Sequence, residues 1–305
     1  MQGRVGGERS SFRTIAYVMA VPLAGLAVFF LWNWLHGGVT PRDVAREVRN
    51  VAAPPAPVAS AATVAAAPQE APLPKVTRAR HRPRTATGGG EIALIIDDLG
   101  FDGQHLDRIM ALDPNINCAI LPNGTHTAQF AETLHARGFE ILCHLPMEPR
   151  GGESPGRNAI VTSLSDDDIV RVTRENLAAV PYARGVNNHM GSRATTDRRV
   201  MTSVLRTLPP EMYFIDSRTT GGSVAADVAR ELNVRTAARN VFLDDVQSES
   251  AVRRQLDELA DEAARRGVAV GIGHPYPVTL RVLAAGLPEL RARGFRLVRA
   301  SEVVR

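Results

Sequence analysis

Residues 92–98 have the sequence Ile-Ala-Leu-Ile-Ile-Asp-Asp, in which an apolar run ends abruptly in two carboxylates. Five further apolar runs after residue 90 lead in the same way to His144, His189, Asp216, Asp244 and His274. Buried parallel strands are short apolar runs, and in a β/α barrel the loops that follow the strands form the active site. We therefore expect these side chains to gather at the carboxyl ends of six parallel strands.

The remainder of the C-terminal region alternates between strand and helix patterns. Strands are predicted at 92–97, 116–121, 139–145, 185–190, 212–216, 241–244, 268–273 and 295–299. Helices are predicted at 103–112, 126–137, 165–180, 197–207, 223–232, 249–265 and 278–293. Strict alternation indicates a parallel sheet with helical crossovers. Since no phosphate-binding glycine motif follows the first strand, residues 91–305 are predicted to form an α/β fold, a distorted (β/α) barrel of seven or eight parallel strands.

The loop at 146–163 is longer than most connections in compact domains. It is a candidate rim or lid over the strand ends, and the alternative is a poorly ordered excursion. Cys118 and Cys143 each fall inside a predicted strand. Two buried free thiols are favoured over a disulfide, and the spacing argues against a cysteine-based zinc site.

The N-terminal region has a different composition. Residues 14–35 carry no charge and follow Arg4, Arg9 and Arg13. An apolar stretch of about 20 residues spans a bilayer, and basic residues favour the cytoplasmic side. This pattern predicts a cytoplasmic N-terminus at 1–13 and a single-pass anchor at 14–35 in the cytoplasmic membrane, with the rest of the chain on the periplasmic side. The alternative is a cleaved signal peptide, although no convincing small-residue cleavage site follows.

Residues 36–90 are rich in Ala and Pro and carry five basic side chains between 75 and 84. Such a composition buries too little apolar surface to fold, so this segment is predicted to be a disordered linker. Residues 1–90 carry 11 basic and four acidic side chains, whereas residues 91–305 carry 25 and 28. The high isoelectric point therefore belongs to the N-terminal region, and no nucleic-acid partner is expected.

Asp97 and Asp98 are adjacent, so on an extended strand they would point to opposite sides. If the strand end bends, one carboxylate can bind a divalent metal while the other takes a proton from water. The alternative role for such a pair is to cap a turn or a helix. The order of the residues does not decide between the two.

Three histidines follow predicted strands: His144, His189 and His274. With Asp98 they could supply a set of two histidines and one carboxylate for a divalent metal, preferably zinc. Such a centre suits amide or ester hydrolysis, but the sequence does not fix which histidine binds metal and which acts as an acid. Asp216 could orient a ligand histidine, Arg218 could contact substrate, and Asp244 follows a strand; helix capping is the alternative for each.

Six segments resemble the divergent polysaccharide deacetylase family, a branch of the polysaccharide deacetylase superfamily. They are Ile-Ile-Asp-Asp-Leu-Gly (95–100), His-Leu-Pro-Met-Glu-Pro (144–149), Asn-Asn-His-Met-Gly-Ser (187–192), Phe-Ile-Asp-Ser-Arg-Thr (214–219), Val-Phe-Leu-Asp (241–244) and Ile-Gly-His-Pro-Tyr-Pro (272–277). The resemblance implies a distorted β/α barrel and metal-dependent removal of N- or O-acetyl groups from cell-wall or related polysaccharides.

By this resemblance, Asp97 corresponds to the catalytic base, His274 to the general acid, and Asp98 and His144 to metal ligands. The second histidine of the superfamily's metal motif falls on Glu148, so His189 is the expected replacement ligand. The usual Arg-x-Pro-x-Gly segment is also missing. Substrate-contacting or supporting roles are assigned to Glu148, Asn188, Asp216, Arg218 and Asp244.

The leading hypothesis is a membrane-anchored hydrolase that removes acetyl groups from a polysaccharide or peptidoglycan-like substrate outside the cytoplasm. Glu148 at a histidine position motivates an alternative, in which a catalytically weak barrel binds glycan or an envelope partner. Hydrolysis of a phosphoester at the same metal ranks lower, because no second carboxylate-rich cluster is evident.

Overall fold

A computed structural model describes residues 89–305 of the chain. The predicted cytoplasmic N-terminus (1–13), the membrane anchor (14–35) and nearly all of the linker (36–90) lie outside the described residues. In the described part, every helix is too short or too polar to cross a membrane.

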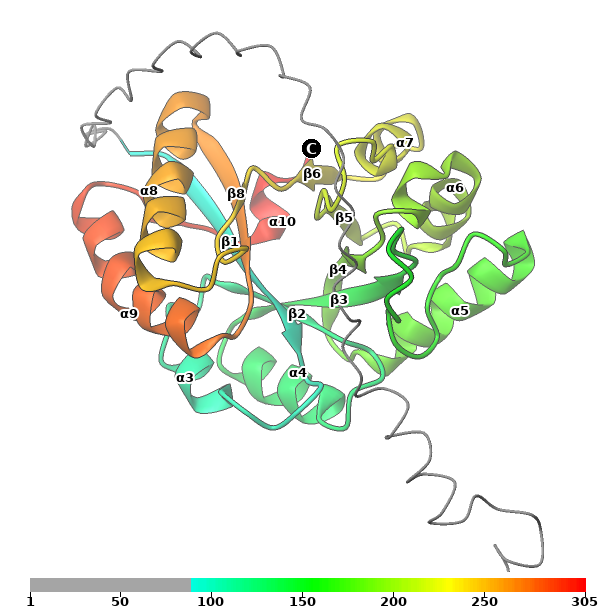
Figure 1. Ribbon diagram of the computed structural model, residues 1–305, viewed down its shortest axis with the longest axis horizontal. Helices are drawn as coiled ribbons and strands as arrows, with labels where there is room; N and C mark the ends of the chain where they lie inside the picture. Colours follow the sequence, from blue (N-terminus) through cyan, green and yellow to red (C-terminus); the bar gives the residue numbers. More distant parts are fainter. Residues whose placement is uncertain (1–88) are drawn as a thin grey trace, which may run out of the picture. The chain divides into compact units, whose positions relative to one another are not determined.

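One parallel sheet forms the centre of the fold (Figure 1). Its strands are β1 (Glu91–Leu99), β2 (Asn117–Ile120), β3 (Glu140–Met147), β4 (Ala183–Met190), β5 (Tyr213–Asp216), β6 (Thr236–Ala238), β7 (Val241–Phe242), β8 (Val268–Gly273) and β9 (Arg296–Leu297). Eight strands follow the order β6-β5-β4-β3-β2-β1-β8-β7, and β9 pairs with β1. The curled parallel sheet agrees with the predicted β/α barrel.

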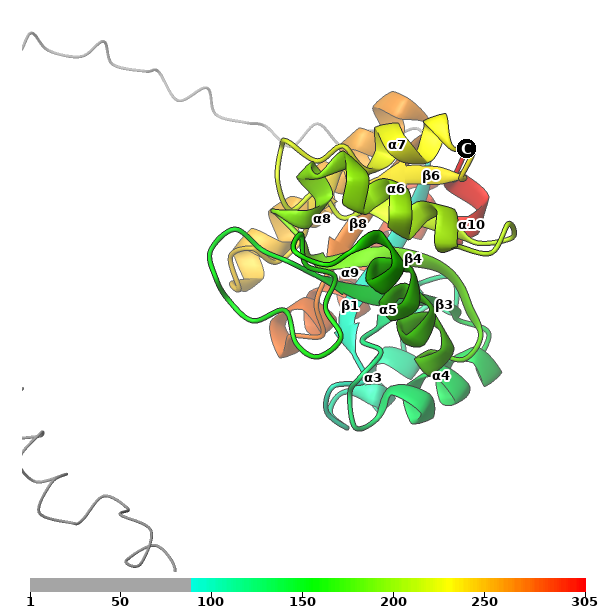
Figure 2. The same ribbon diagram turned by 90° about the vertical axis from the view of Figure 1, so that its right-hand side faces the viewer.

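Most helices lie on the outer side of the sheet, and the last one packs at the amino-terminal end of the barrel (Figures 1 and 2). They are α3 (Leu106–Met110), α4 (Thr127–Ala136), α5 (Asp166–Ala179), α6 (Arg198–Thr207), α7 (Ala225–Glu231), α8 (Glu249–Arg266), α9 (Pro277–Ala292) and α10 (Ala300–Val303), with a short 3-10 helix, η1 (Ala194–Thr196). The predicted start and stop signals act as expected: Ser165 accepts a hydrogen bond from the Asp168 N–H at the start of α5, and Gly267 ends α8 at a φ of 82°.

The distortion of the barrel is located between β6 and β7. These strands follow each other directly in sequence but lie at opposite ends of the strand order, separated only by Arg239 and Asn240. Arg239 N–H donates to Asp216 O, and Asn240 N–H donates to Val270 O. The two residues therefore join the two edges of the sheet, and we call this place the seam. With only two residues between the strands, the seam has no crossover helix.

The barrel interior is filled by small and β-branched side chains. Its buried members include Ala93, Ile95, Ala119, Leu142, Ile215, Val270 and Ile272, with Val298, Val303 and Val304 closing the amino-terminal end. Side chains two residues apart on a strand share a face. The same inner face therefore continues from Ile95 to Asp97, from Leu142 to His144 and from Ile272 to His274.

The structure distinguishes between the alternatives for the long loop and for the two cysteines. Next to the first strand, Gly90 is buried and its carbonyl accepts the Arg296 N–H. The long loop is fixed to the body of the protein rather than a free excursion, since Ile160 forms a parallel bridge with Met147. Cys118 and Cys143 are confirmed as buried free thiols, and burial raises the pKa of Cys143 to about 12.

A buried polar cluster lies at the amino-terminal end of the barrel. Glu140 accepts hydrogen bonds from the Tyr213 hydroxyl at 2.7 Å and from the backbone N–H of Ser301 at 2.8 Å. Gly185 pairs with Tyr213 across the sheet, and a Cβ atom on Gly185 would lie 2.4 Å from the Tyr213 ring. This close approach requires glycine, because the ring is fully buried and its hydroxyl is held by Glu140.

We predict that Gly185→Ala destabilises the protein by about 1–3 kcal/mol, the usual cost of overpacking a core. The methyl group would displace the Tyr213 ring and weaken its bond to Glu140. Urea unfolding of the full chain measures the change. Gly221→Ala is the control, because no atom lies within 4 Å of its Cβ position. Equal stability of the two variants would contradict the packing argument.

Candidate functional site

The end of β1 brings two adjacent carboxylates to one place. Asp98 has a φ of 59°, in the left-handed region, and the pairing of β1 with β2 shifts register between Ile96 and Leu99. An extra residue in one strand produces such a bulge and redirects the side chain at that position. Asp97 keeps its place on the inner face, and the bulge turns Asp98 toward the same pocket.

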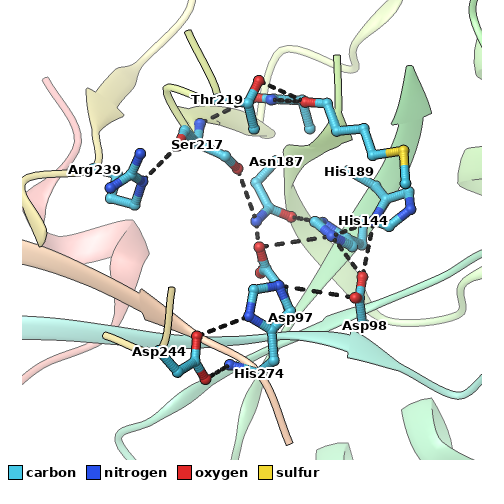
Figure 3. A network of polar contacts seen from close by, with 12 residues as sticks. Asp97, Asp98, His144, Asn187, His189, Ser217, Thr219, Arg239, Asp244 and His274 are labelled. Atoms are coloured by element: carbon cyan, nitrogen blue, oxygen red, sulfur yellow. Dashed lines mark hydrogen bonds and ion pairs between the residues drawn. The ribbon is translucent and has the colours of Figure 1, made fainter. Parts of the chain in front are cut away.

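Two histidines from neighbouring strands meet Asp98 there (Figure 3). Asp98 Oδ1 lies 2.8 Å from His189 Nδ1 and 3.2 Å from His144 Nε2, and the two ring nitrogens are 3.2 Å apart. The candidate ligand atoms of all three residues lie within 4.8 Å of one another. The structure thus brings together the three predicted ligands, one from each of β1, β3 and β4.

Asn187 fixes the orientation of His144. Its side-chain NH₂ donates to Asp97 Oδ1 at 2.8 Å, so its oxygen faces His144 Nδ1 at 2.9 Å and accepts a hydrogen bond from Nδ1–H. With its proton on Nδ1, the neutral ring presents the lone pair of Nε2 to Asp98 and His189. Hydrogen bonds of this kind set which nitrogen of a histidine is free to bind a metal.

The donor set fits a divalent cation. Two imidazole nitrogens and one carboxylate oxygen converge, as in protein sites that leave positions open for water and substrate. Among residues 89–305, Asp98 Oδ1 faces the ring nitrogens of His144 and His189 rather than backbone N–H groups. A buried carboxylate oxygen is costly unless a donor or a cation satisfies it, and one cation at this position would satisfy the carboxylate and both imidazoles together. Burial disfavours the Asp98 charge, but His144 and His189 hold its pKa well below the usual range.

Asp97 lies beside the three candidate ligands and is not one of them. Its side chain is 3% exposed, and burial raises its pKa although His144 and His274 oppose this. Asn187 occupies Oδ1, whereas Oδ2 lies 3.6 Å from His144 Nε2. One oxygen therefore faces the ligand set without a hydrogen bond from Asn187.

His274 faces the same pocket from the end of β8. Its Nδ1 lies 2.9 Å from Asp244 Oδ1, and its Nε2 lies 3.8 Å from Asp98 Oδ2. Asp244 Oδ2 also accepts hydrogen bonds from the His274 N–H and the Thr279 hydroxyl. Burial lowers the pKa of His274, but its bond to Asp244 and the nearby Asp97 outweigh this and raise it to about 9. At neutral pH both ring nitrogens of His274 therefore carry a proton. The bond from Nδ1 to Asp244 directs Nε2 toward Asp98.

Other predicted site residues have supporting contacts. Glu148 accepts hydrogen bonds from Thr162 and pairs with Arg193, so it ties the loop after β3 to the segment after β4. Asp216 caps the loop after β5 through the Arg218 N–H and the Ser223 hydroxyl. Of the two roles considered for Asp216, the structure places it in the capping one, and Asn187 is the residue that orients a histidine.

Two residues were missed by sequence reasoning. Asn187 was passed over in favour of Asn188, which braces the loops by accepting the Ser217 N–H and donating to Met190 O. The alternation along β4 could have revealed this, because Asn187 shares a face with His189. Arg239 at the seam donates to the carbonyls of Ser217 and Arg218, and no sequence signal marked it.

Comparison with known proteins gives a family match over residues 94–304, described as divergent polysaccharide deacetylase. The uncharacterized protein YibQ of Escherichia coli is 38% identical over 195 residues, which are 64% of this chain and 61% of that protein. An uncharacterized protein of Haemophilus influenzae is 37% identical over 204 residues, 66% of this chain and 72% of its own length. The chain thus spans less than two thirds of the Escherichia coli relative.

The fold is similar to a crystal structure of an uncharacterized protein from Agrobacterium tumefaciens. The two have a TM-score of 0.69 and 22% identical residues, over 73% of this chain and 95% of the other. At this level of identity, the similarity concerns the fold alone.

We predict that Asn187→Ala weakens zinc binding by about 10–100-fold, as loss of the partner of a ligand histidine does. The variant removes the hydrogen bonds that Asn187 forms with His144 Nδ1 and Asp97 Oδ1. Competition with a chromophoric chelator measures the affinity. Asn123→Ala serves as the control, because the exposed Asn123 amide donates to Arg157 O and Asn176 Oδ1 and to none of the candidate ligands. Wild-type zinc affinity in Asn187→Ala would show that this amide does not orient His144.

Proposed function

This chain belongs to the divergent polysaccharide deacetylase family, and we propose that it is a metal-dependent hydrolase that removes acetyl groups from an extracytoplasmic polysaccharide. The observation that carries the proposal is the placement of Asp97 and His274 around the ligand set of Asp98, His144 and His189. A buried carboxylate and a protonated imidazole beside one cation site provide a base and an acid for hydrolysis.

Asp98, His144 and His189 would hold the divalent cation, for which zinc is the first choice. When bound, the cation supplies Lewis acidity that polarises the acetyl carbonyl and lowers the pKa of a water molecule. The protein contributes an oriented donor set, in which His144 is 2% exposed and its ring is held by Asn187.

Proton transfer is assigned to Asp97 and His274. As the water oxygen attacks the acetyl carbon, Asp97 takes the water proton on Oδ2, because Asn187 occupies Oδ1. As the carbon–nitrogen or carbon–oxygen bond breaks, His274 donates the proton on Nε2 to the leaving amine or alcohol. Acetate and a free amino or hydroxyl group result. Asp244 keeps the His274 ring oriented throughout by accepting a hydrogen bond from Nδ1–H.

The alternative function, glycan or partner binding without catalysis, was motivated by Glu148 at a histidine position. That motivation is weaker in the structure, because His189 offers the third donor that Glu148 does not. Glu148 instead bonds to Thr162 and Arg193.

We also propose that residues 14–35 anchor the chain in the cytoplasmic membrane, with residues 89–305 on the periplasmic side. The support is the uncharged stretch after three arginines. A polysaccharide or peptidoglycan-like substrate in the cell envelope would be accessible from that position.

We expect the purified full chain to release acetate from acetylated wall glycan, and Asp97→Asn to reduce the rate by about 100-fold or more, the usual contribution of a general base. A chelator should abolish release, and zinc should restore it. The assay measures acetate, and metal content is determined for each preparation.

Asp98→Ala is the matched variant, because it should lose the metal whereas Asp97→Asn should keep it. Acetate release that is unchanged in Asp97→Asn would contradict the role of this carboxylate. Glycan binding at unchanged affinity, with no acetate from any preparation, would favour the binding function instead.

For the anchor, we predict that the full chain fractionates with the cytoplasmic membrane, and that protease added to the periplasm digests residues 89–305. A chain without residues 1–35 should leave the membrane fraction. Protection of the full chain from periplasmic protease in intact spheroplasts would contradict the proposed orientation.

A further inference from the structure

A polar cavity of about 280 Å³ lies at the seam. It is lined by the loop after β5, the connection between β6 and β7, and the last turns of α8. Three arginines contribute to its wall: Arg218, Arg239 and Arg266. Asn240 and Glu262 complete most of its polar lining. The cavity exists because no crossover helix covers the sheet between β6 and β7.

The cavity has more positive than negative charge. Arg218 makes its hydrogen bonds through its backbone, and its exposed guanidinium has no ion-pair partner among residues 89–305. Arg239 donates only to backbone carbonyls. Glu262, the single carboxylate in the wall, pairs with Arg266 and also with Arg265. Among residues 89–305, the guanidinium groups of Arg218 and Arg239 therefore form no ion pair with a carboxylate.

Arg218 and Arg239 lie close enough to influence each other. Burial lowers the pKa of Arg239 most, Asp97, Asp216 and Asp245 raise it, and the neighbouring Arg218 lowers it. Like charges held together in this way are stabilised when an anion binds between them.

Arg239, in the cavity wall, is linked to the candidate active site through a short chain of contacts (Figure 3). Arg239 Nε donates to Ser217 O at 2.6 Å, and the Ser217 hydroxyl lies 3.4 Å from the Asn187 NH₂. That NH₂ group donates to Asp97. Two residues, Ser217 and Asn187, thus lie between Arg239 and the proposed base.

We propose that this cavity is a substrate subsite that binds an anionic group on a sugar adjacent to the acetylated one, so that the protein acts on an acidic glycan. This inference rests on the proposed deacetylase function and specifies its substrate class. Arginine presents several N–H donors in one plane and binds carboxylate or phosphate with two parallel hydrogen bonds. The anionic group could therefore be the carboxylate of an acidic sugar or a phosphate ester.

The test compares the binding of three acetylated oligosaccharides of equal length to the full chain by calorimetry. One is neutral, one carries lactyl carboxylates, and one carries a phosphate ester. We expect an anionic oligosaccharide to bind about tenfold more tightly than the neutral one, as a charge-assisted contact would produce. Added salt should reduce the preference. Tighter binding of the carboxylate or of the phosphate form alone identifies the anionic group, and either result supports the subsite.

Arg218→Gln should remove most of the preference, and Arg218→Lys, which keeps the charge but not the planar fork, should retain part of it. Arg206→Gln is the matched control, because Arg206 lines a different cavity between α5 and α6. Equal affinity for neutral and anionic oligosaccharides, or a preference that survives Arg218→Gln, would overturn the proposal.

Binding is measured separately from turnover, so the two proposals can fail independently. A preference that depends on Arg218, in a protein that never releases acetate, would overturn the deacetylase function and leave the anionic subsite in place. Acetate release at the same rate from neutral and anionic glycans, with no dependence on Arg218, would overturn the subsite alone.

Discussion

The left-handed backbone at Asp98 is the constraint on which the candidate active site depends. Adjacent residues of a regular strand point to opposite sides, so an unbent β1 would direct Asp98 away from the barrel interior. The bulge, with a φ of 59°, lets Asp97 and Asp98 face one pocket in different roles. A non-glycine residue in this conformation costs free energy, and such strain commonly occurs where function requires it. His144 and His189 are arranged around the position that Asp98 reaches in this way.

Charge balance explains why the pocket suits a divalent cation. Asp97, Asp98 and Asp244 supply three carboxylates, and His274 supplies one positive charge at neutral pH. With neutral His144 and His189, the pocket has a formal charge of about −2, which a divalent cation would balance. Burial opposes protonation of His144, yet Asp97 and Asp98 raise its pKa. A proton and a cation would compete for Nε2 of this ring, so affinity should be linked to pH.

The sequence predicted the strands well, because buried parallel strands are apolar on both faces and end where polar loops begin. It also predicted that Asp98, His144 and His189 would meet, since the ends of parallel strands share one edge. The bulge could not be predicted, because the Asp-Asp pair is compatible with a regular strand, a turn or a cap. The seam was missed for a different reason: β6 is only Thr236–Ala238, too short and too weakly apolar to produce a pattern. Arg239 was missed with it.

The carboxylates at the two ends of the barrel have different contacts, and the difference separates a stabilising role from a metal-binding one. At the amino-terminal end, Glu140 receives hydrogen bonds from Tyr213 and from the backbone and side chain of Ser301. A carboxylate satisfied in this way needs no ligand and holds α10 in place. At the carboxyl end, the Asp98 side chain is 33% exposed, and its Oδ1 faces the ring nitrogens of His144 and His189 instead of backbone N–H groups. Imidazole nitrogens can exchange such a contact for a shared cation, which the donors around Glu140 cannot do, so this arrangement suits a metal-ligand set.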